Sequence, residues 1–290
     1  MSHAVADLFR QAADLNEHDP QRHGATVYPP ADCDIVLAGD IHGHRRNFTR
    51  IIAAADLGNH PNRRLILQEL IHGPDDPRTG TDRSIEMAMR AARLKLQHPG
   101  QVVFIMANHD AAQITGSEIT KQGRGSIQAF KEGLADNYPD DVEEILDAVE
   151  EFLRSQPLAV QTPGGVLATH SLPHPKRMEM AGTDILGRDY REEDFRRGQP
   201  VYEWTWGRRH TPEQLEELAE WLEVSFFAIG HQHVEQGWET IGQRGVVIAS
   251  DHERGCLLHF AADETLTGDN VASHVHQIAM LSGALAPIGN

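Results

Sequence analysis

The chain has 290 residues, of which 40% are hydrophobic and 24% charged, so it can bury a core and has the composition of a soluble globular protein. No apolar run approaches the roughly 20 residues that span a bilayer, and the N-terminal segment lacks the apolar stretch of a signal peptide. A formal net charge of −17 disfavours a nucleic-acid-binding protein, because an acidic surface repels phosphates. With two cysteines only, Cys33 and Cys256, we expect no disulfide framework and predict a cytoplasmic protein.

The first half of the chain alternates predicted strands with predicted helices. Short apolar runs at 34–38, 64–67 and 102–106 are typical of buried strands. Segments 45–57 and 84–97 between them have the apolar spacing of helices, the first with Gly58 placed to end it. This alternation favours a parallel sheet with helices on its faces.

The second half begins with a helical insertion at about 123–157, whose clearest helix is 140–155. A polar region at 173–210 precedes a helix that Thr211 caps and Pro212 starts. Predicted strands follow at five places, and the closely spaced last three are expected to pair with one another: 158–161, 166–169, 225–229, 245–249 and 255–260.

These elements predict one α/β domain at 31–265, a sandwich of sheets with helices outside. Residues 1–30 are interpreted as an N-terminal extension and linker that contains a short helix at 4–16. Residues 266–290 are interpreted as a C-terminal extension.

Four short polar motifs each follow an apolar strand directly. Ligands of open α/β sheets bind beyond the carboxyl ends of the strands, so these motifs are expected to converge. Their carboxylate, imidazole and amide groups are the ligands of borderline divalent metals. The motifs are Gly39-Asp40-Ile41-His42-Gly43, Ala107-Asn108-His109-Asp110, Thr169-His170-Ser171 and Gly230-His231-Gln232-His233.

Spacing within the motifs adds to this interpretation. Asp40 and His42 are one residue apart, and on an extended segment they would project to the same side and could hold one ion. His231 and His233 repeat the pattern. A single strand-end histidine is more often an ordinary hydrogen-bonded residue than a ligand, but four such motifs are hard to explain by packing.

In this order, GDIHGH, NHD, a strand-end histidine and GHQH resemble the calcineurin-like metallophosphoesterases, and most closely their phosphoprotein phosphatase and diadenosine tetraphosphatase branch. The resemblance spans about Asp34 to Phe260. It implies a four-layer α/β/β/α sandwich of two mixed sheets flanked by helices. It also implies hydrolysis of phosphate esters or phosphoanhydrides by a hydroxide that bridges two divalent ions of manganese, iron or zinc.

The resemblance further implies two groups of ligands and a bridging carboxylate, for which Glu69 is the aligned acid. One ion would be held by Asp40, His42 and His233, and the other by Asn108, His170 and His231.

The stretch from Gln68 to Gly73 departs from the family pattern. Glu69 is one methylene longer than the family's aspartate, and His72 stands where the family has a second aspartate. No arginine follows to bind the phosphate, so Arg124, Arg208 or Arg209 would have to supply the guanidinium. The departure fits a working variant, an enzyme for a different substrate or a weakened site. We favour the first because the six other ligand positions hold competent residues.

His109 is implied to be the general acid that protonates the leaving oxygen, a role that suits an imidazole at neutral pH. Asp110 or His72 could hold its tautomer, although Asp110 could equally cap a helix and His72 could be an ordinary loop residue. Trp204 and Trp206 could form a substrate wall beside Arg208 and Arg209, or simply pack in the core.

Three functions remain open from the sequence. The leading one is a phosphatase acting on a phosphorylated protein, nucleotide or small molecule. A phosphodiesterase is the first alternative, and a non-catalytic protein that binds metal or phosphate is the second. The sequence leaves the metal and the oligomeric state open.

Overall fold

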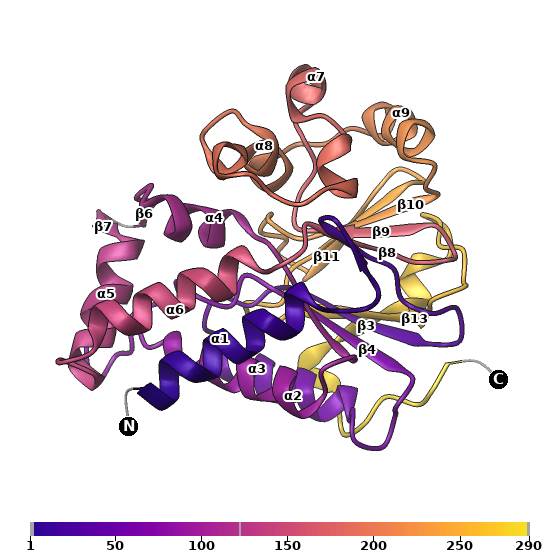
Figure 1. Ribbon diagram of the computed structural model, residues 1–290. Coiled ribbons are helices and arrows are strands. Elements are labelled where there is room, and N and C mark those ends of the chain that lie inside the picture. The colour runs from indigo at the N-terminus through magenta and orange to yellow at the C-terminus, as the bar shows by residue number, and fades with distance from the viewer. Residues whose placement is uncertain (1–2, 122, 289–290) are drawn as a thin grey trace.

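The computed structural model describes residues 3–121 and 123–288. Its two large sheets lie face to face with helices on the outer faces, which is the predicted four-layer arrangement (Figure 1). The seven-stranded sheet has the order β1 (Arg22–His23), β2 (Thr26–Val27), β8 (Ala159–Gln161), β9 (Val166–Thr169), β10 (Phe226–Ile229), β12 (Gly245–Ile248) and β11 (Trp238–Ile241). The five-stranded sheet has the order β14 (Val275–Gln277), β13 (Cys256–Ala261), β3 (Asp34–Asp40), β4 (Arg63–Gln68) and β5 (Val102–Ile105). A small hairpin joins β6 (Thr120–Lys121) to β7 (Arg124–Gly125).

Both large sheets are mixed, as predicted. Strands β3, β4 and β5 are parallel neighbours, and β13 joins them antiparallel to β3. In the other sheet β9, β10 and β12 are parallel, and β11 is antiparallel to β12. The carboxyl ends of the central parallel strands therefore lie at one edge of each sheet, where ligands of such sheets bind.

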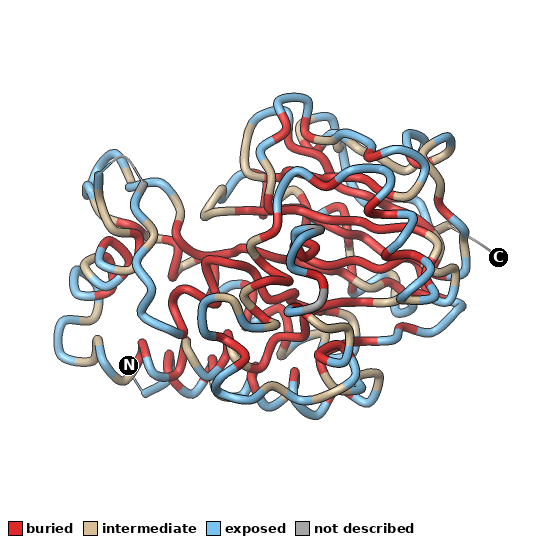
Figure 2. Tube along the Cα trace, turned by 90° about the horizontal axis from the view of Figure 1, so that it is seen from above, coloured by how far each residue is buried: buried red, intermediate tan, exposed pale blue. Residues whose placement is uncertain are grey.

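Apolar side chains of alternate strand residues fill the space between the sheets. The five-stranded sheet contributes Ile35, Leu37, Ile66 and Ile105, and the other sheet contributes Phe226, Ala228, Val246 and Ile248. Figure 2 shows this buried zone running through the middle of the molecule. Because successive side chains of a strand point to opposite faces, the remaining strand residues pack against the helices.

Nine α-helices lie in the described residues: α1 (His3–Glu17), α2 (Arg45–Ala55), α3 (Ile85–Gln97), α4 (Asn108–Thr115), α5 (Ser126–Asn137), α6 (Val142–Arg154), α7 (Met178–Ala181), α8 (Pro200–Trp206) and α9 (Pro212–Leu222). Helix α1, predicted as part of an extension, packs on α6 and α3. The Phe9 ring is fully buried and lies 5.6 Å from that of Phe152. Residues 3–17 are thus packed against the rest of the molecule.

Two predictions about the elements were wrong. Helix α2 ends before Gly58, because Asp56 adopts the left-handed conformation that closes the helix, with its N–H donated to Ile52. Strands β10 and β12 pair as expected, but β13 pairs with β3 in the other sheet. Leu258 and Phe260 of β13 face the core between the sheets while Leu257 packs under the helices. A strand that is apolar on both faces needs a covered, central position.

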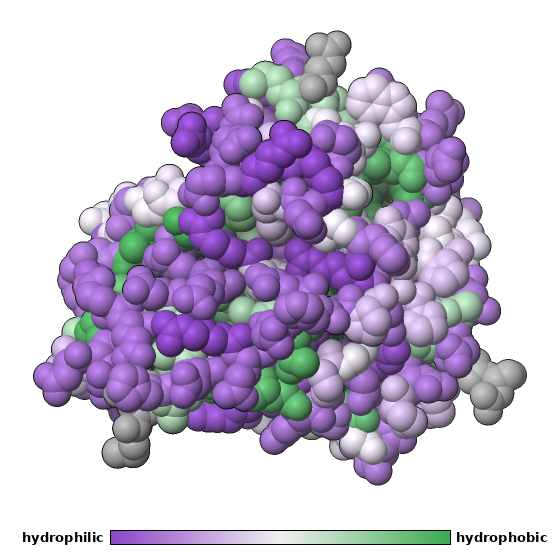
Figure 3. All heavy atoms as spheres, in the orientation of Figure 1, coloured by the Kyte–Doolittle hydropathy of each residue, from purple (hydrophilic) through white to green (hydrophobic). Residues whose placement is uncertain are grey.

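The face drawn in Figure 3 is mostly hydrophilic, with small separate apolar patches. Among the described residues, no helix has the length and apolar character to cross a membrane.

Candidate metal and phosphate site

The carboxyl ends of strands from both sheets meet at one place. Asp40 is the last residue of β3, and Glu69 directly follows β4. Asn108 begins α4 shortly after β5, and His170 directly follows β9. The backbone N–H of Ser250, after β12, donates to the Asp40 carbonyl at 3.1 Å and links the two sheets there. Three of the four predicted motifs are thus brought together with Glu69, as the parallel order of the strands requires.

Two glycines allow this close approach. A Cβ at Gly39 would collide with the carbonyl of Ile248 in the opposite sheet. A Cβ at Gly230 would collide with the Asp40 carboxylate and lie 2.7 Å from the Gln68 side-chain oxygen. A side chain at Gly39 would push the two backbones apart, and one at Gly230 would displace the Asp40 and Gln68 side chains.

The backbone of the site is strained. Seven non-glycine residues of the described chain have positive φ, and two of them, Asp56 and Glu223, only cap helices. The other five lie at the site or on the loop beside it: His42, Glu69, His72, Arg209 and His231. Residues held in this region cost of order 1–3 kcal/mol each and cluster at functional sites. The expectation that Asp40 and His42 share an extended segment was wrong, since His42 lies in a turn with φ of 43°.

His170 is the buried centre of one ligand group. Its Nδ1 contacts the Gln68 side-chain oxygen at 2.8 Å, while the Gln68 amide donates to the Ala38 carbonyl. This pattern assigns the proton to Nδ1 and turns the Nε2 lone pair toward the site. Nε2 then faces three further possible ligand atoms, namely Asn108 Oδ1 at 2.9 Å, His231 Nδ1 at 3.1 Å and Glu69 Oε2 at 3.1 Å.

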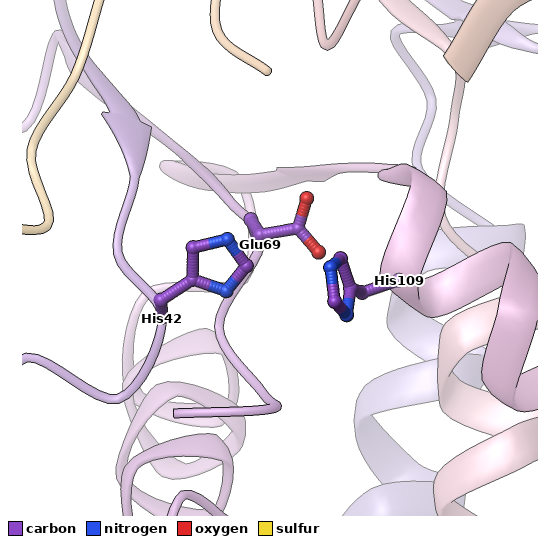
Figure 4. A group of neighbouring side chains, drawn as sticks. All are labelled: His42, Glu69 and His109. Carbon is purple, nitrogen blue, oxygen red and sulfur yellow. The ribbon is translucent and has the colours of Figure 1, made fainter. Parts of the chain in front are cut away.

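The second group is formed by His42, Glu69 and His109, whose ligand atoms lie within 4.8 Å of one another. Figure 4 shows the Glu69 carboxylate pointing between the two imidazoles, which come from the turn after β3 and from α4. The rings of His42 and His109 are 5.0 Å apart. Glu69 also belongs to the group with His170 and His231, so one carboxylate is common to both clusters.

The chemistry of these donors fits divalent cations. Burial lowers the pKa of His170 to about 4 and that of His231 well below its usual value, so both imidazoles are neutral, as metal ligands must be. Burial, followed by the charge of Glu69, raises the pKa of Asp40 to about 7 and that of Asp110 well above its usual range. Carboxylates crowded away from water in this way favour a cation between them.

His233 is not brought into either group. It is exposed and lies with Asp251 and His252, its ring 5.2 Å from that of His252. Its partner in the motif, His231, is buried. His231 and His233 would point to the same side only on an extended strand. Because His231 has a left-handed backbone conformation, the two side chains point in different directions.

The side chains of Asp110 and His72 have structural contacts. Asp110 accepts the backbone N–H of Ala107 at 3.0 Å and so caps α4, the alternative that the sequence left open. Nδ1 of His72 contacts the carbonyl of Ser126 at 3.1 Å, and its ring lies 5.5 Å from that of His109.

The three candidate arginines line two separate pockets. Arg124 lines a pocket of about 540 Å³ together with His42 and His72, but it is paired with Asp75 at 2.5 Å and with Glu132. The pocket wall is acidic, with Asp75, Asp82 and Asp251. Arg208 and Arg209 are exposed and line a separate pocket of about 560 Å³. An anion is therefore attracted to the Arg208 side.

The two tryptophans differ in role. Trp204 is fully buried, and its indole N–H donates to the Gly182 carbonyl, so it belongs to the core. Trp206 is half-buried, stacks on Tyr202 and lines the same pocket as Arg208.

Gln68, which contacts His170, was not predicted from the sequence, and neither was the separate group that Asp251 and His252 form with His233. Gln68 is a polar residue in an apolar strand, immediately before Glu69, and that buried position was the available signal. Asp251 and His252 follow β12 and carried no comparable pattern.

Two phosphatases are among the solved structures with a similar fold. A protein serine/threonine phosphatase from Saccharomyces cerevisiae, with similarity to human phosphatase PP5, matches 90% of this chain and 83% of its own, with a TM-score of 0.65 and 15% identity. The cold-active protein-tyrosine phosphatase of a psychrophilic Shewanella species matches 86% of this chain and 80% of its own, with a TM-score of 0.55 and 13% identity.

The chain has the fold of these phosphatases. No protein-family model matches the sequence, and no curated protein sequence matches it. Structural likeness at such low identity establishes the fold alone, so the chemistry rests on the residues of this chain.

Proposed function

We propose that this protein hydrolyses phosphate monoesters or phosphoanhydrides with two divalent cations. The observation that carries the proposal is the position of Glu69, whose carboxylate is common to two clusters of candidate ligands. One cation is assigned to Asp40, His42 and Glu69, and the other to Glu69, Asn108, His170 and His231. His233 is proposed as a further ligand of the first cation. To bind it, the loop that carries His233 must move toward Asp40 and His42.

Bound cations would neutralise the phosphate and make a water molecule more acidic. The protein's own residues supply the remaining roles. His109, beside Glu69, gives a ring proton to the leaving oxygen. Asp110 fixes the start of α4 through the Ala107 N–H and so positions His109. Arg208 and Arg209 attract the phosphate, while Arg124 remains paired with acidic neighbours.

The test is hydrolysis of p-nitrophenyl phosphate and its bis ester by metal-stripped protein to which manganese, zinc or iron is restored. We expect metal-dependent turnover of the monoester, lowered at least about 100-fold in Glu69→Gln because that variant loses the shared charge. Glu239→Gln, an exposed change in β11 outside both clusters, is the control. Preferential turnover of the bis ester would point to a phosphodiesterase. Metal uptake without turnover of either ester would reject the enzyme and favour a binding protein.

A second comparison tests His233. His233→Ala lowers metal content if the loop turns inward, whereas unchanged metal content and turnover would remove His233 from the ligand set.

A further inference from the structure

The pocket beside Arg208 is basic, although the protein as a whole is acidic. We call it the basic pocket, and its lining includes five cationic side chains: Lys176, Arg177, Arg197, Arg208 and Arg209. All five are exposed, and the net charge of the chain is −17. A cluster of positive charges on an otherwise acidic protein is typical of a binding site for an anion.

Most of the protein's ion pairs lie elsewhere. Among the side chains that the structure describes, no carboxylate lies within ion-pair distance of any of the five, whereas other arginines, such as Arg188 and Arg244, are paired. The acidic residue of the lining is Glu203, whose side chain is buried and interacts electrostatically with Arg177. Five exposed cations against one buried carboxylate leave the pocket with an excess of positive charge.

The pocket is joined to the metal site. Trp206, which lines it, has its ring 6.3 Å from that of His231, and Arg208 follows Trp206 by two residues and lines the same pocket. The loop that carries Arg208 is fixed by a hydrogen bond of 2.6 Å from the Ser171 hydroxyl to the Gly207 carbonyl. The strained backbone of Arg209, with φ of 60°, lies in this loop.

The five cations come from separate segments of the chain that line one pocket. Lys176 and Arg177 lie in the segment before α7, Arg197 lies before α8, and Arg208 and Arg209 follow α8. The stacked rings of Tyr202 and Trp206, with centroids 5.4 Å apart, form one wall of the same pocket.

We propose that the basic pocket binds a second anionic group of the substrate, so that the protein acts on compounds that carry a phosphate or carboxylate in addition to the scissile phosphate. Arg208 contacts the scissile phosphate, and Lys176, Arg177 and Arg197 contact the second group. This inference deepens the proposed function and depends on it for turnover.

The kinetic test compares fructose 6-phosphate with fructose 1,6-bisphosphate, which differ by one phosphate. We expect kcat/KM to be at least about tenfold higher for the bisphosphate, because charge-assisted hydrogen bonds to the second group stabilise its complex. We expect the ratio of the two kcat/KM values to fall to about twofold or less in the triple variant Lys176→Gln, Arg177→Gln, Arg197→Gln. Twofold is the ratio for a substrate that merely offers two equivalent phosphates. Turnover of p-nitrophenyl phosphate, which has no second anionic group, should be unchanged. Arg196→Gln, exposed and outside the pocket, keeps the wild-type ratio. A wild-type ratio near two, or a high ratio that survives in the triple variant, overturns the proposal.

A binding test separates failure of this proposal from failure of the proposed function. Tryptophan fluorescence of metal-free protein, without chelator, is titrated with inorganic tripolyphosphate. Quenching that is lost in Trp206→Phe and weakened at least about tenfold in the triple variant supports an anion site even if no ester is turned over. Absence of binding, or binding that the triple variant retains, rejects the site.

Discussion

At the scale of single residues, Gln68 determines which nitrogen of His170 faces the candidate metals. Its side-chain amide is held by the Ala38 carbonyl, which leaves its oxygen to accept from His170 Nδ1. The sequence suggested His170 as a ligand but gave no indication of what orients it. Partners of this kind commonly tune a metal site as strongly as the ligands do.

We expect Gln68→Met, nearly isosteric but unable to orient His170, to lower metal affinity by roughly 10–100-fold. Competition with a metal indicator measures this, and exposed Gln236→Met is the control. Unchanged affinity in Gln68→Met would show that the hydrogen bond does not position the ligand.

His109 provides a second prediction at this scale. We expect His109→Asn to lower kcat for an alkyl phosphate by roughly 10²–10⁴-fold, and that for p-nitrophenyl phosphate much less, because nitrophenolate leaves without a proton. Steady-state kinetics with both substrates measure the difference. Equal losses accompanied by lower metal content would instead make His109 a ligand, as its position beside Glu69 also permits.

At the scale of elements, the site depends on how closely strand ends can approach. Strand β3 ends at a candidate ligand, and β4, β9 and β10 are each followed within two residues by one. Two of these ligands, Glu69 and His231, have left-handed backbone conformations that turn the chain toward the site. The glycine at the end of β10 leaves room for the Asp40 carboxylate. The strained backbone conformations at these strand ends cost stability, and they position the candidate ligands.

We expect Gly230→Ala to reduce metal content strongly and to destabilise the protein by about 1–3 kcal/mol, since its methyl group overlaps Asp40. Metal analysis and thermal unfolding measure the two effects. Gly100→Ala, where nothing lies within 4 Å of the added carbon, is the matched control. A fully loaded, stable Gly230→Ala protein would show that the strand ends can separate without loss.

At the scale of the whole molecule, a buried ionic cluster holds the five-stranded sheet together away from the metal site. Fully buried Arg63 at the start of β4 donates to Asp34 Oδ2 at 2.7 and 2.9 Å, and His259 of β13 contacts the same oxygen at 2.6 Å. Burial alone would raise the pKa of Asp34, but these hydrogen bonds and the charge of Arg63 lower it to about 2.

A lowered pKa means that this carboxylate stabilises the folded protein above its unfolded pKa, near 4, and that the contribution is lost as the pH falls toward 2. We expect Asp34→Asn to lower the free energy of unfolding by about 3–5 kcal/mol at pH 7, because Arg63 is left buried without its partner. Urea unfolding from pH 7 to pH 2 should show the difference from wild type shrinking only below about pH 4. Exposed Asp32→Asn is the control, and a constant difference down to pH 2 would contradict the assignment.

The sequence by itself determined the alternation of strands and helices and the placement of Asp40, Asn108, His170 and His231 at strand ends, because apolar periodicity and parallel strands are local and directional features. The tertiary structure decided that β13 joins the other sheet and that His233 stands apart from His231. It also brought Gln68 against His170 and gathered the cations of the basic pocket. These features depend on sheet order and loop conformation. Both are determined by contacts between residues that are distant in the chain, so no local sequence pattern predicts them.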